Sequence, residues 1–355
     1  MSGSRYWIDL ASARVGGRVL VASDEFFAPK ENLLKPEPPI FKAGKYTDRG
    51  KWMDGWETRR RRGGGHDWCV VGLGIPGAPR QIVVDTSHFT GNHPAACSIE
   101  AATLERDPSI EDLPSLEGTW EEVVSRSDLA GDTENLLSVR KNAAMRCGPI
   151  GFTHVRLHVY PDGGVARLRV RGEARPDWAR ILAGGEAVDL AGVTHGGIVL
   201  ASSDEFYGAP MNLLMPGPGA DMSDGWETRR RRGPGHDWVA LRLGRRGVIE
   251  RIEVDTSHFK GNYPESCSVD GWDAGTSEPR DGASGVPALR AEFGHEGWRE
   301  ILPRSPVGPH ARHLFGMDRP VEPVTHVRLH IHPDGGVSRF RVFGRPVSAP
   351  AAEGS

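Results

Sequence analysis

One mostly polar stretch occurs twice in this chain, at 54–68 and again at 224–238. Each copy contains a Glu, a run of four Arg, a His and an Asp at the same spacing, and each copy ends in Trp. Because a hydrophobic core needs volume rather than particular residues, apolar positions drift easily between the copies of a repeat. Charged residues that keep both identity and spacing therefore indicate a chemical role.

The arginines and histidines of this stretch are suited to anion binding and proton transfer. Arginine binds a carboxylate through two parallel hydrogen bonds, and His, Asp or Glu can act as a general acid or base. In an extended run, Arg59 and Arg61 face opposite to Arg60. We therefore expect one or two arginines to bind a carboxylate, and the others to form structural ion pairs or to meet solvent.

A second duplicated block, at 84–92 and 254–262, is typical of a strand that runs into a tight turn. Asp85 and His88 can pair there, and Asn92 can bind a urea-like amide. Asp24 and Glu25 follow the end of another predicted strand, where adjacent carboxylates can be a base and its orienting partner. A turn with a capping Asp is the alternative interpretation of that pair.

A predicted β-hairpin at 153–170 has one polar face. His154, Arg156 and His158 share one parity, so they project from the same side of a strand. The second copy places His, Arg, His and His at 326, 328, 330 and 332. This stripe is either a surface that holds an anion and moves protons or the solvated outer face of a sandwich. Parity alone favours the outer face, whereas the duplication of the same residues supports the functional surface.

Several other chemistries find little support. The sequence contains neither His-Glu-x-x-His nor Cys-x-x-Cys, so no metal or other cofactor is implied, although a loosely bound divalent metal on Asp and His stays open. It has no Gly-x-Ser-x-Gly elbow for a serine nucleophile. A net charge of −3, with Glu57 and Asp67 flanking the Arg run, argues against nucleic-acid binding.

The elements that must position these residues belong to an internal repeat. Leu34 recurs 180 positions later and Asp54 recurs 170 positions later, so the first copy carries ten extra residues between them. A period this long predicts two duplicated domains, 1–174 and 175–355, rather than a solenoid.

Within each domain the pattern is one of strands and turns. With 46 Gly and 27 Pro, the chain is punctuated too densely for long helices, and 136–145 is the one short helix that we predict. Several strands in about 170 residues predict an all-β fold, with an antiparallel sandwich of jelly-roll type in each domain. The predicted strands include 16–22, 68–73 and 81–85, and their copies at 197–201, 238–243 and 249–255.

The cellular compartment of the protein is predicted from the spacing of its cysteines and from the residues at its N-terminus. Four Cys without a close pair are typical of a reduced compartment. The N-terminus has no apolar run of the kind found in signal peptides, and no segment approaches the ~20 apolar residues of a membrane span. We therefore expect a cytoplasmic protein that does not associate with membranes.

Together the duplicated blocks resemble the allantoicase family, from about Asp9 to Gly344. The resemblance implies two tandem jelly-roll (galactose-binding-like) domains and association into homo-oligomers. It also implies a hydrolase of C–N bonds in linear amidines, which converts allantoate into (S)-ureidoglycolate and urea in purine breakdown. The first-copy blocks that carry it are Ser-Asp-Glu-Phe-Phe at 23–27, Asn-Leu-Leu at 32–34, Asp-Gly-Trp-Glu-Thr-Arg-Arg at 54–60, Gly-His-Asp-Trp at 65–68, Asp-Thr-Ser-His-Phe at 85–89 and His-Val-Arg-Leu at 154–157.

Allantoate carries one carboxylate and two ureido arms on a single carbon, so its recognition needs a cation and amide-matching groups, and its cleavage needs proton transfer. We expect the catalytic groups among His66, His88, Asp24, Glu25, Glu57, His236, His258 and Glu205. We expect the substrate-binding groups among Arg59, Arg60, Asn92, Arg156, Arg229, Arg230, Asn262 and Arg328.

Two other functions compete with this hypothesis. A non-catalytic tandem jelly-roll protein would bind carbohydrate on loop aromatics. A metal-dependent amidohydrolase acting on the carbamoyl carbon would release ammonia and carbon dioxide rather than urea. An assay for urea release from allantoate separates all three.

Overall fold

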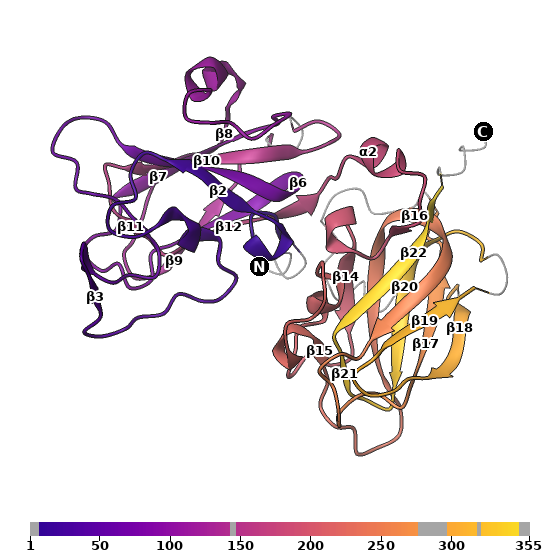
Figure 1. The fold of residues 1–355 in the computed structure, drawn as a ribbon. Coiled ribbons are helices and arrows are strands. Elements are labelled where there is room, and N and C mark those ends of the chain that lie inside the picture. Colours follow the sequence, from indigo (N-terminus) through magenta and orange to yellow (C-terminus); the bar gives the residue numbers. More distant parts are fainter. Residues whose placement is uncertain (1–6, 143–146, 276–296, 318–320, 348–355) are drawn as a thin grey trace. The chain divides into compact units, whose positions relative to one another are not determined.

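The computed structural model describes residues 7–142, 147–275, 297–317 and 321–347. Contacts divide the chain into two compact units, one of which is Trp7–Asp177 while the other begins at Trp178. Each unit is a β-sandwich of the jelly-roll type, so the predicted all-β fold is confirmed (Figure 1). The domain boundary expected between 174 and 175 stays a prediction.

One long strand, β6 (Asp67–Asp85), organises the first unit. Its first part pairs with β10 (Phe152–Tyr160) and β2 (Arg18–Ala22). Its second part pairs with β12 (Arg167–Ala174) and β9 (Glu134–Ser138). Since both groups of strands share β6, this strand links the two layers of the sandwich. The other strands of this unit are β1 (Ile8–Asp9), β3 (Tyr46–Thr47), β4 (Gly50–Lys51), β5 (Trp56–Glu57), β7 (Ala96–Ala102), β8 (Glu121–Asp128) and β11 (Gly164–Val165).

The second unit repeats this topology around β16 (Asp237–Asp255). This strand pairs with β20 (Val324–His332) and β14 (Ile198–Ser202), and farther along with β22 (Arg339–Pro346) and β19 (Arg312–Gly316). The remaining described strands are β13 (Val188–Asp189), β15 (Trp226–Glu227), β17 (Ser266–Trp272), β18 (Arg299–Pro306) and β21 (Gly336–Val337).

Helical segments in the described chain are short, as the Gly and Pro content predicts. The α-helix α2 spans Trp178–Leu182. The 3-10 turns are η2 (Ala13–Val15), η3 (Lys30–Leu34), η4 (Leu113–Thr119), η5 (Val193–His195), η6 (Pro210–Leu214) and η7 (Met222–Asp224).

Two local predictions were wrong. The segments on either side of the turn at 161–164 do not pair as a hairpin, because β10 and β12 each pair with a different part of β6. Alternation records which side of a strand is buried but not which strand lies beside it. The predicted helix at 136–145 begins instead within strand β9, since pairing with β6 outweighs local helix propensity; its positions 143–145 lie outside the described residues.

The polar face of β10 is not a solvated surface. His154 and Arg156 are buried on that face, as Val155 and Leu157 are on the opposite face. Trp120 and Leu113, which lie between β7 and β8 in the sequence, pack against Val70 of β6 and cover this face of the sheet. The interpretation as an outer face was therefore wrong for these two side chains.

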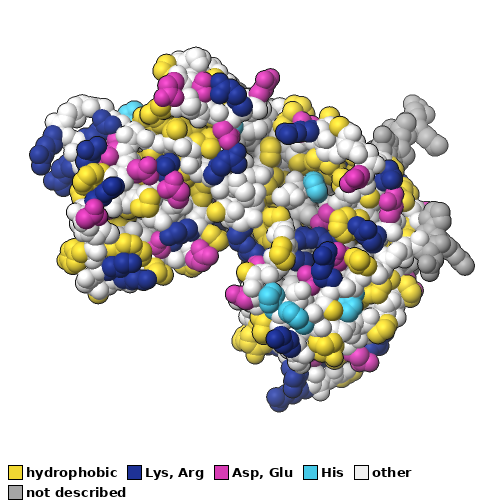
Figure 2. Space-filling model, viewed as in Figure 1, with side chains coloured by type: hydrophobic (Ala, Val, Ile, Leu, Met, Phe, Trp, Pro, Cys, Tyr) yellow, Lys and Arg dark blue, Asp and Glu magenta, His cyan; other side chains and the backbone are white. Residues whose placement is uncertain are grey.

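Charge on the surface is mixed in sign. Figure 2 shows Lys and Arg side chains interspersed with Asp and Glu over most of the viewed face, with clusters of basic side chains at its left and lower edges. Among the helices of the described residues, none is long and apolar enough to cross a membrane.

Candidate functional site

The duplicated polar stretch begins on a two-stranded ribbon at one end of each sandwich. In the first repeat, β5 pairs with β11, with Glu57 opposite Gly164. Trp56 is fully buried and its indole N–H donates to the Asp24 carbonyl over 2.8 Å. The buried Trp56 ring therefore holds the ribbon against the core, while the arginines that follow the ribbon are exposed to solvent.

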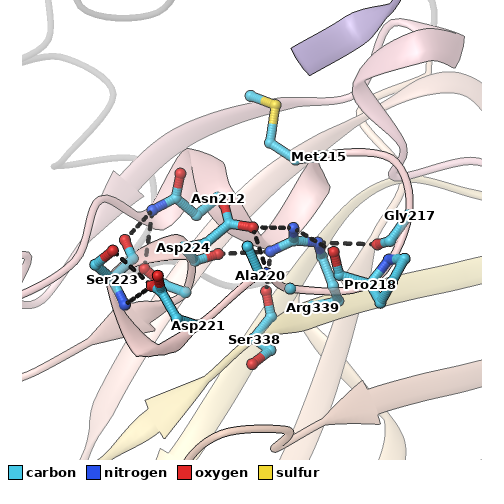
Figure 3. A network of polar contacts seen from close by, with 12 residues as sticks. Asn212, Met215, Gly217, Pro218, Ala220, Asp221, Ser223, Asp224, Ser338 and Arg339 are labelled. Carbon is cyan, nitrogen blue, oxygen red and sulfur yellow. Dashed lines mark hydrogen bonds and ion pairs between the residues drawn. The ribbon is translucent and has the colours of Figure 1, made fainter. Parts of the chain in front are cut away.

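A buried arginine holds the chain just before this ribbon. In the second repeat, Arg339 is 3% exposed and donates to Asp224 Oδ2 over 2.7 Å and to the Asp224 carbonyl over 2.6 Å. Figure 3 shows its guanidinium between Asp224 and the carbonyls of Gly217 and Pro218. Arg167 makes the same ion pair with Asp54 in the first repeat, also over 2.7 Å.

A carboxylate and an amide meet at the open end of each ribbon. Asn92 Nδ2 donates to Glu57 Oε1 over 2.6 Å, and Asn262 Nδ2 donates to Glu227 Oε1 over 2.5 Å. In the second repeat this pair lines a pocket of about 480 Å³, together with Arg230. Neither amide oxygen accepts a hydrogen bond from another described residue, so each can accept one from a ligand.

Alternate members of the Arg run are bound to the protein. The Arg59 main-chain N–H donates to Asp24 Oδ2 over 2.8 Å, and its side-chain Nε lies 3.2 Å from the same carboxylate. Arg61 donates to Asp67 Oδ1 through Nε and Nη2, over 2.9 and 2.7 Å. The exposed Arg60 side chain has no hydrogen bond or ion pair within the described part of the chain.

The second Arg run is arranged in the same way. Arg229 pairs with Asp204 over 2.8 Å and Arg231 pairs with Asp237 over 2.5 Å. Arg230 is exposed, lines the pocket and, among the residues described, bonds to no protein group. In both repeats the first and third arginines of the run form ion pairs within the protein, and the second remains available to a ligand.

His66 is the first member of a chain of polar contacts that runs into the sandwich. Its Nε2 lies 2.8 Å from His158 Nδ1, and His158 Nε2 lies 2.8 Å from Glu100 Oε2. Arg156 donates to the same Glu100 oxygen over 2.8 Å. With the carboxylate accepting from His158 Nε2, the His158 Nδ1 accepts the proton of His66 Nε2, and the contacts fix the His66 tautomer.

The second repeat has the equivalent contacts with Asp in place of Glu. His236 Nε2 lies 2.7 Å from His330 Nδ1, and His330 Nε2 lies 2.9 Å from Asp270 Oδ2. Arg328 also donates to Asp270 Oδ2, over 2.7 Å. His332 stands where the first repeat has Tyr160, and its ring centroid lies 4.4 Å from that of His236.

Burial and neighbouring charge shift several of these groups. Burial, followed by the charges of His158 and Arg61, lowers the pKa of His66. Burial acts to raise the pKa of Asp270, but its hydrogen bonds with His330 and Arg328 outweigh this and lower the pKa to about 2. The first shift favours the neutral form of His66 in the first repeat, and the second favours the ionised form of Asp270 in the second repeat.

Glu57 is shifted in the opposite direction. Burial raises its pKa, against the hydrogen bond from Asn92 and the charge of Lys51. A carboxyl group whose pKa moves towards neutrality is a better proton donor and acceptor for catalysis near pH 7.

His88 and His258 lie at a strained turn. Their φ angles are 70° and 72°, in the left-handed region, which costs a bulky residue about 1–2 kcal/mol. His88 Nε2 contacts the Pro39 carbonyl at 3.2 Å, and His258 Nε2 contacts the Gly219 carbonyl at 2.9 Å. One nitrogen of each ring is therefore occupied by the main chain.

The remaining predicted residues are distributed around the site. Glu25 accepts hydrogen bonds from the Lys30 main chain and side chain, over 3.1 and 3.2 Å, and Glu205 is exposed. Arg156 is buried, with Glu117 as a further partner over 2.8 Å. Asp24 and its copy bind the first arginine of each run, as described above.

Sequence reasoning missed the inner carboxylates Glu100 and Asp270. They lie directly across a strand pair from Arg156 and Arg328. An available signal was that both positions are acidic and lie 170 residues apart, which is the offset of the duplicated blocks.

Comparison with known proteins places these observations in a family. The allantoicase repeat model matches residues 8–175 and 188–347. The chain belongs to the allantoicase family. It is 48% identical over 342 residues to "Probable allantoicase 2" of Burkholderia pseudomallei, covering 96% of this chain and 95% of that protein. It is 44% identical to an allantoicase of Dictyostelium discoideum, covering 94% and 86%.

Solved allantoicase structures have the same fold. The allantoicase crystal structure from Saccharomyces cerevisiae matches with a TM-score of 0.74 at 37% identity, covering 95% of this chain and 93% of that one. A second allantoicase structure matches with a TM-score of 0.75 at 38% identity. The family resemblance expected from the duplicated blocks is confirmed.

The described residues of this allantoicase family member do not form a metal site. Within residues 7–142, 147–275, 297–317 and 321–347, no group of three or more His, Cys, Asp or Glu is placed to hold a metal ion.

Proposed function

We propose that this chain hydrolyses allantoate to (S)-ureidoglycolate and urea, and that it does so in the pocket formed by Glu227, Asn262 and Arg230 of the second repeat. Membership of the allantoicase family supports the reaction. The observation that carries the location is a guanidinium without a protein partner among the described residues, at a pocket that also contains a carboxylate and an amide.

These three groups match the chemistry of the substrate. Arg230 binds the carboxylate of allantoate, because it is the arginine of this run that lines the pocket and bonds to no other described residue. Asn262 accepts a ureido N–H through its amide oxygen, since its Nδ2 is occupied by Glu227.

Glu227 is placed to transfer the proton that the reaction requires. Water forms a bond to the central carbon and loses a proton, the bond from this carbon to one ureido nitrogen breaks, and that nitrogen gains a proton as urea leaves. One carboxylate can take the first proton and deliver the second. General acid–base help of this kind contributes about 10²–10⁴-fold.

The histidines are ranked by their contacts. His66 and His236 are the stronger candidates for a supporting proton-transfer role, since each is backed by a second histidine and a carboxylate. His88 and His258 better suit the positioning of the turn that carries the pocket asparagine, because each ring contacts a main-chain carbonyl.

Three further inferences accompany this function. Homo-oligomer formation is expected from the family resemblance. A cytoplasmic location is supported by four cysteines that form no disulfide. A loosely bound divalent ion is tested by comparing activity before and after treatment with a chelator and gel filtration.

The test of the function is the set of products released from allantoate by the purified chain. We expect one urea for each allantoate consumed, with ureidoglycolate as the other product. Release of ammonia and carbon dioxide would instead support attack on the carbamoyl carbon. Unchanged allantoate, together with binding to immobilised sugars, would support the carbohydrate-binding alternative.

A further inference from the structure

We propose that each repeat carries its own complete active site, so that one chain has two independent sites for the same ureido-carboxylate substrate. This inference rests on the proposed function, because it multiplies the site described there. Duplication of a fold alone does not require it, since one copy of a duplicated domain can lose its ligand and keep its core.

The reacting groups have the same geometry in both repeats. The amide-to-carboxylate hydrogen bond measures 2.6 Å between Asn92 and Glu57, and 2.5 Å between Asn262 and Glu227. The carboxylate and the amide come from segments 35 residues apart in each repeat. Their meeting in both copies therefore needs the whole end of the sandwich to be preserved.

The frame that holds these groups is also duplicated. The main-chain N–H of Arg61 donates to Asp162 over 2.7 Å, and that of Arg231 donates to Asp334 over 2.7 Å. The main-chain carbonyl of each pocket Asn accepts an N–H bond of 2.7 Å in both copies. The first contact fixes the main chain directly after the second Arg of each run, and the other fixes the main chain of the pocket Asn.

Arg60 and Arg230 are the strongest argument for two working sites. Both are exposed and bond to no other described residue, so neither stabilises the fold through a polar contact. Exposed side chains without partners contribute little to stability, and either arginine could be replaced at small structural cost. Arg62 and Arg232 are exposed in the same way, so the argument depends on position: Arg230 lines the pocket that contains Asn262 and Glu227, and Arg60 is its copy in the first repeat.

Three positions that line the pocket differ between the repeats, whereas others, such as Gly261 and Pro333, have the same residue in both. The three differences lie where no ligand contact is proposed. Phe27, His93 and Ala95 of the first repeat correspond to the pocket-lining Tyr207, Tyr263 and Glu265 of the second.

The experiment measures urea release from allantoate by four full-length proteins: the wild type, Glu57→Gln, Glu227→Gln and the double variant. We expect each single variant to keep a measurable part of the wild-type kcat, and the two parts to add up to the wild-type value. The double variant should lose activity by about 10²–10⁴-fold. Glu-to-Gln changes preserve shape, and thermal melting of each variant checks that it is folded.

Several outcomes would overturn the inference while leaving the proposed function intact. One is that a single variant is inactive while the other retains full activity, which would mean one working site. Another is that both single variants are inactive, which would mean one composite site. Arg60→Ala and Arg230→Ala, which alter only exposed side chains, should instead each weaken binding at one site, so that urea release by either variant fits one site of low KM and one of high KM. An inactive wild-type protein would refute the proposed function itself.

Discussion

Replacing the free arginine of both repeats is the most informative change to substrate binding. We consider the variant Arg60→Ala/Arg230→Ala, which removes Arg230 from the second-repeat pocket and its copy from the first repeat without breaking a hydrogen bond between described residues. A charge-assisted hydrogen-bonded pair contributes about 1.5–3 kcal/mol. Because both side chains are exposed, solvent screens the interaction and the lower end applies, which corresponds to about a tenfold increase in KM.

The assay is steady-state urea release over a range of allantoate concentrations at constant ionic strength. Binding that is equally strong in the ground state and the transition state affects KM rather than kcat, so kcat should change by less than about threefold. Arg62→Ala/Arg232→Ala is the matched control, since these exposed arginines belong to the same runs but do not line the pocket. An unchanged KM in the first variant, or an equal increase in both variants, would refute the assignment.

Three further changes test the charges of the second repeat. Arg339→Met should destabilise the fold by about 3–5 kcal/mol, measured by urea unfolding, because it leaves the Asp224 carboxylate without its buried partner. With the first-repeat site inactivated, Glu265→Ala should lower KM for allantoate about two- to fivefold at low salt, since it removes an exposed negative charge from the pocket, and a higher KM would contradict this. Burial and the charge of Arg242 lower the pKa of His326 to about 4, from 6.5. The unfolded chain then binds more protons between pH 6.5 and 4, so stability should fall by up to about 3 kcal/mol as pH decreases through that window, and His326→Gln should show a flatter dependence.

Much of the fold could be predicted because alternation of apolar and polar residues records which face of a strand is buried. The strands expected at 68–73 and 81–85 are both present, as parts of the continuous β6. Pairing could not be predicted in the same way, because it depends on contacts between distant segments. For that reason β10 and β12 were wrongly expected to form a hairpin.

The site was predictable as a set of residue types but not as an arrangement. Duplication singled out Glu57 and Asn92 separately, yet only the folded chain brings them to 2.6 Å. The distinction between Arg59 and Arg60 likewise depends on Asp24, which binds the first and leaves the second available. Local sequence contains no information on which of two neighbouring arginines a distant carboxylate occupies.

Product analysis of allantoate hydrolysis, run beside the Glu57→Gln/Glu227→Gln double variant, tests the central claim most directly. The wild-type chain should release one urea for each allantoate, and the double variant should be slower by about 10²–10⁴-fold while remaining folded. A wild-type chain that releases ammonia or nothing, or a folded double variant as active as the wild type, would contradict it.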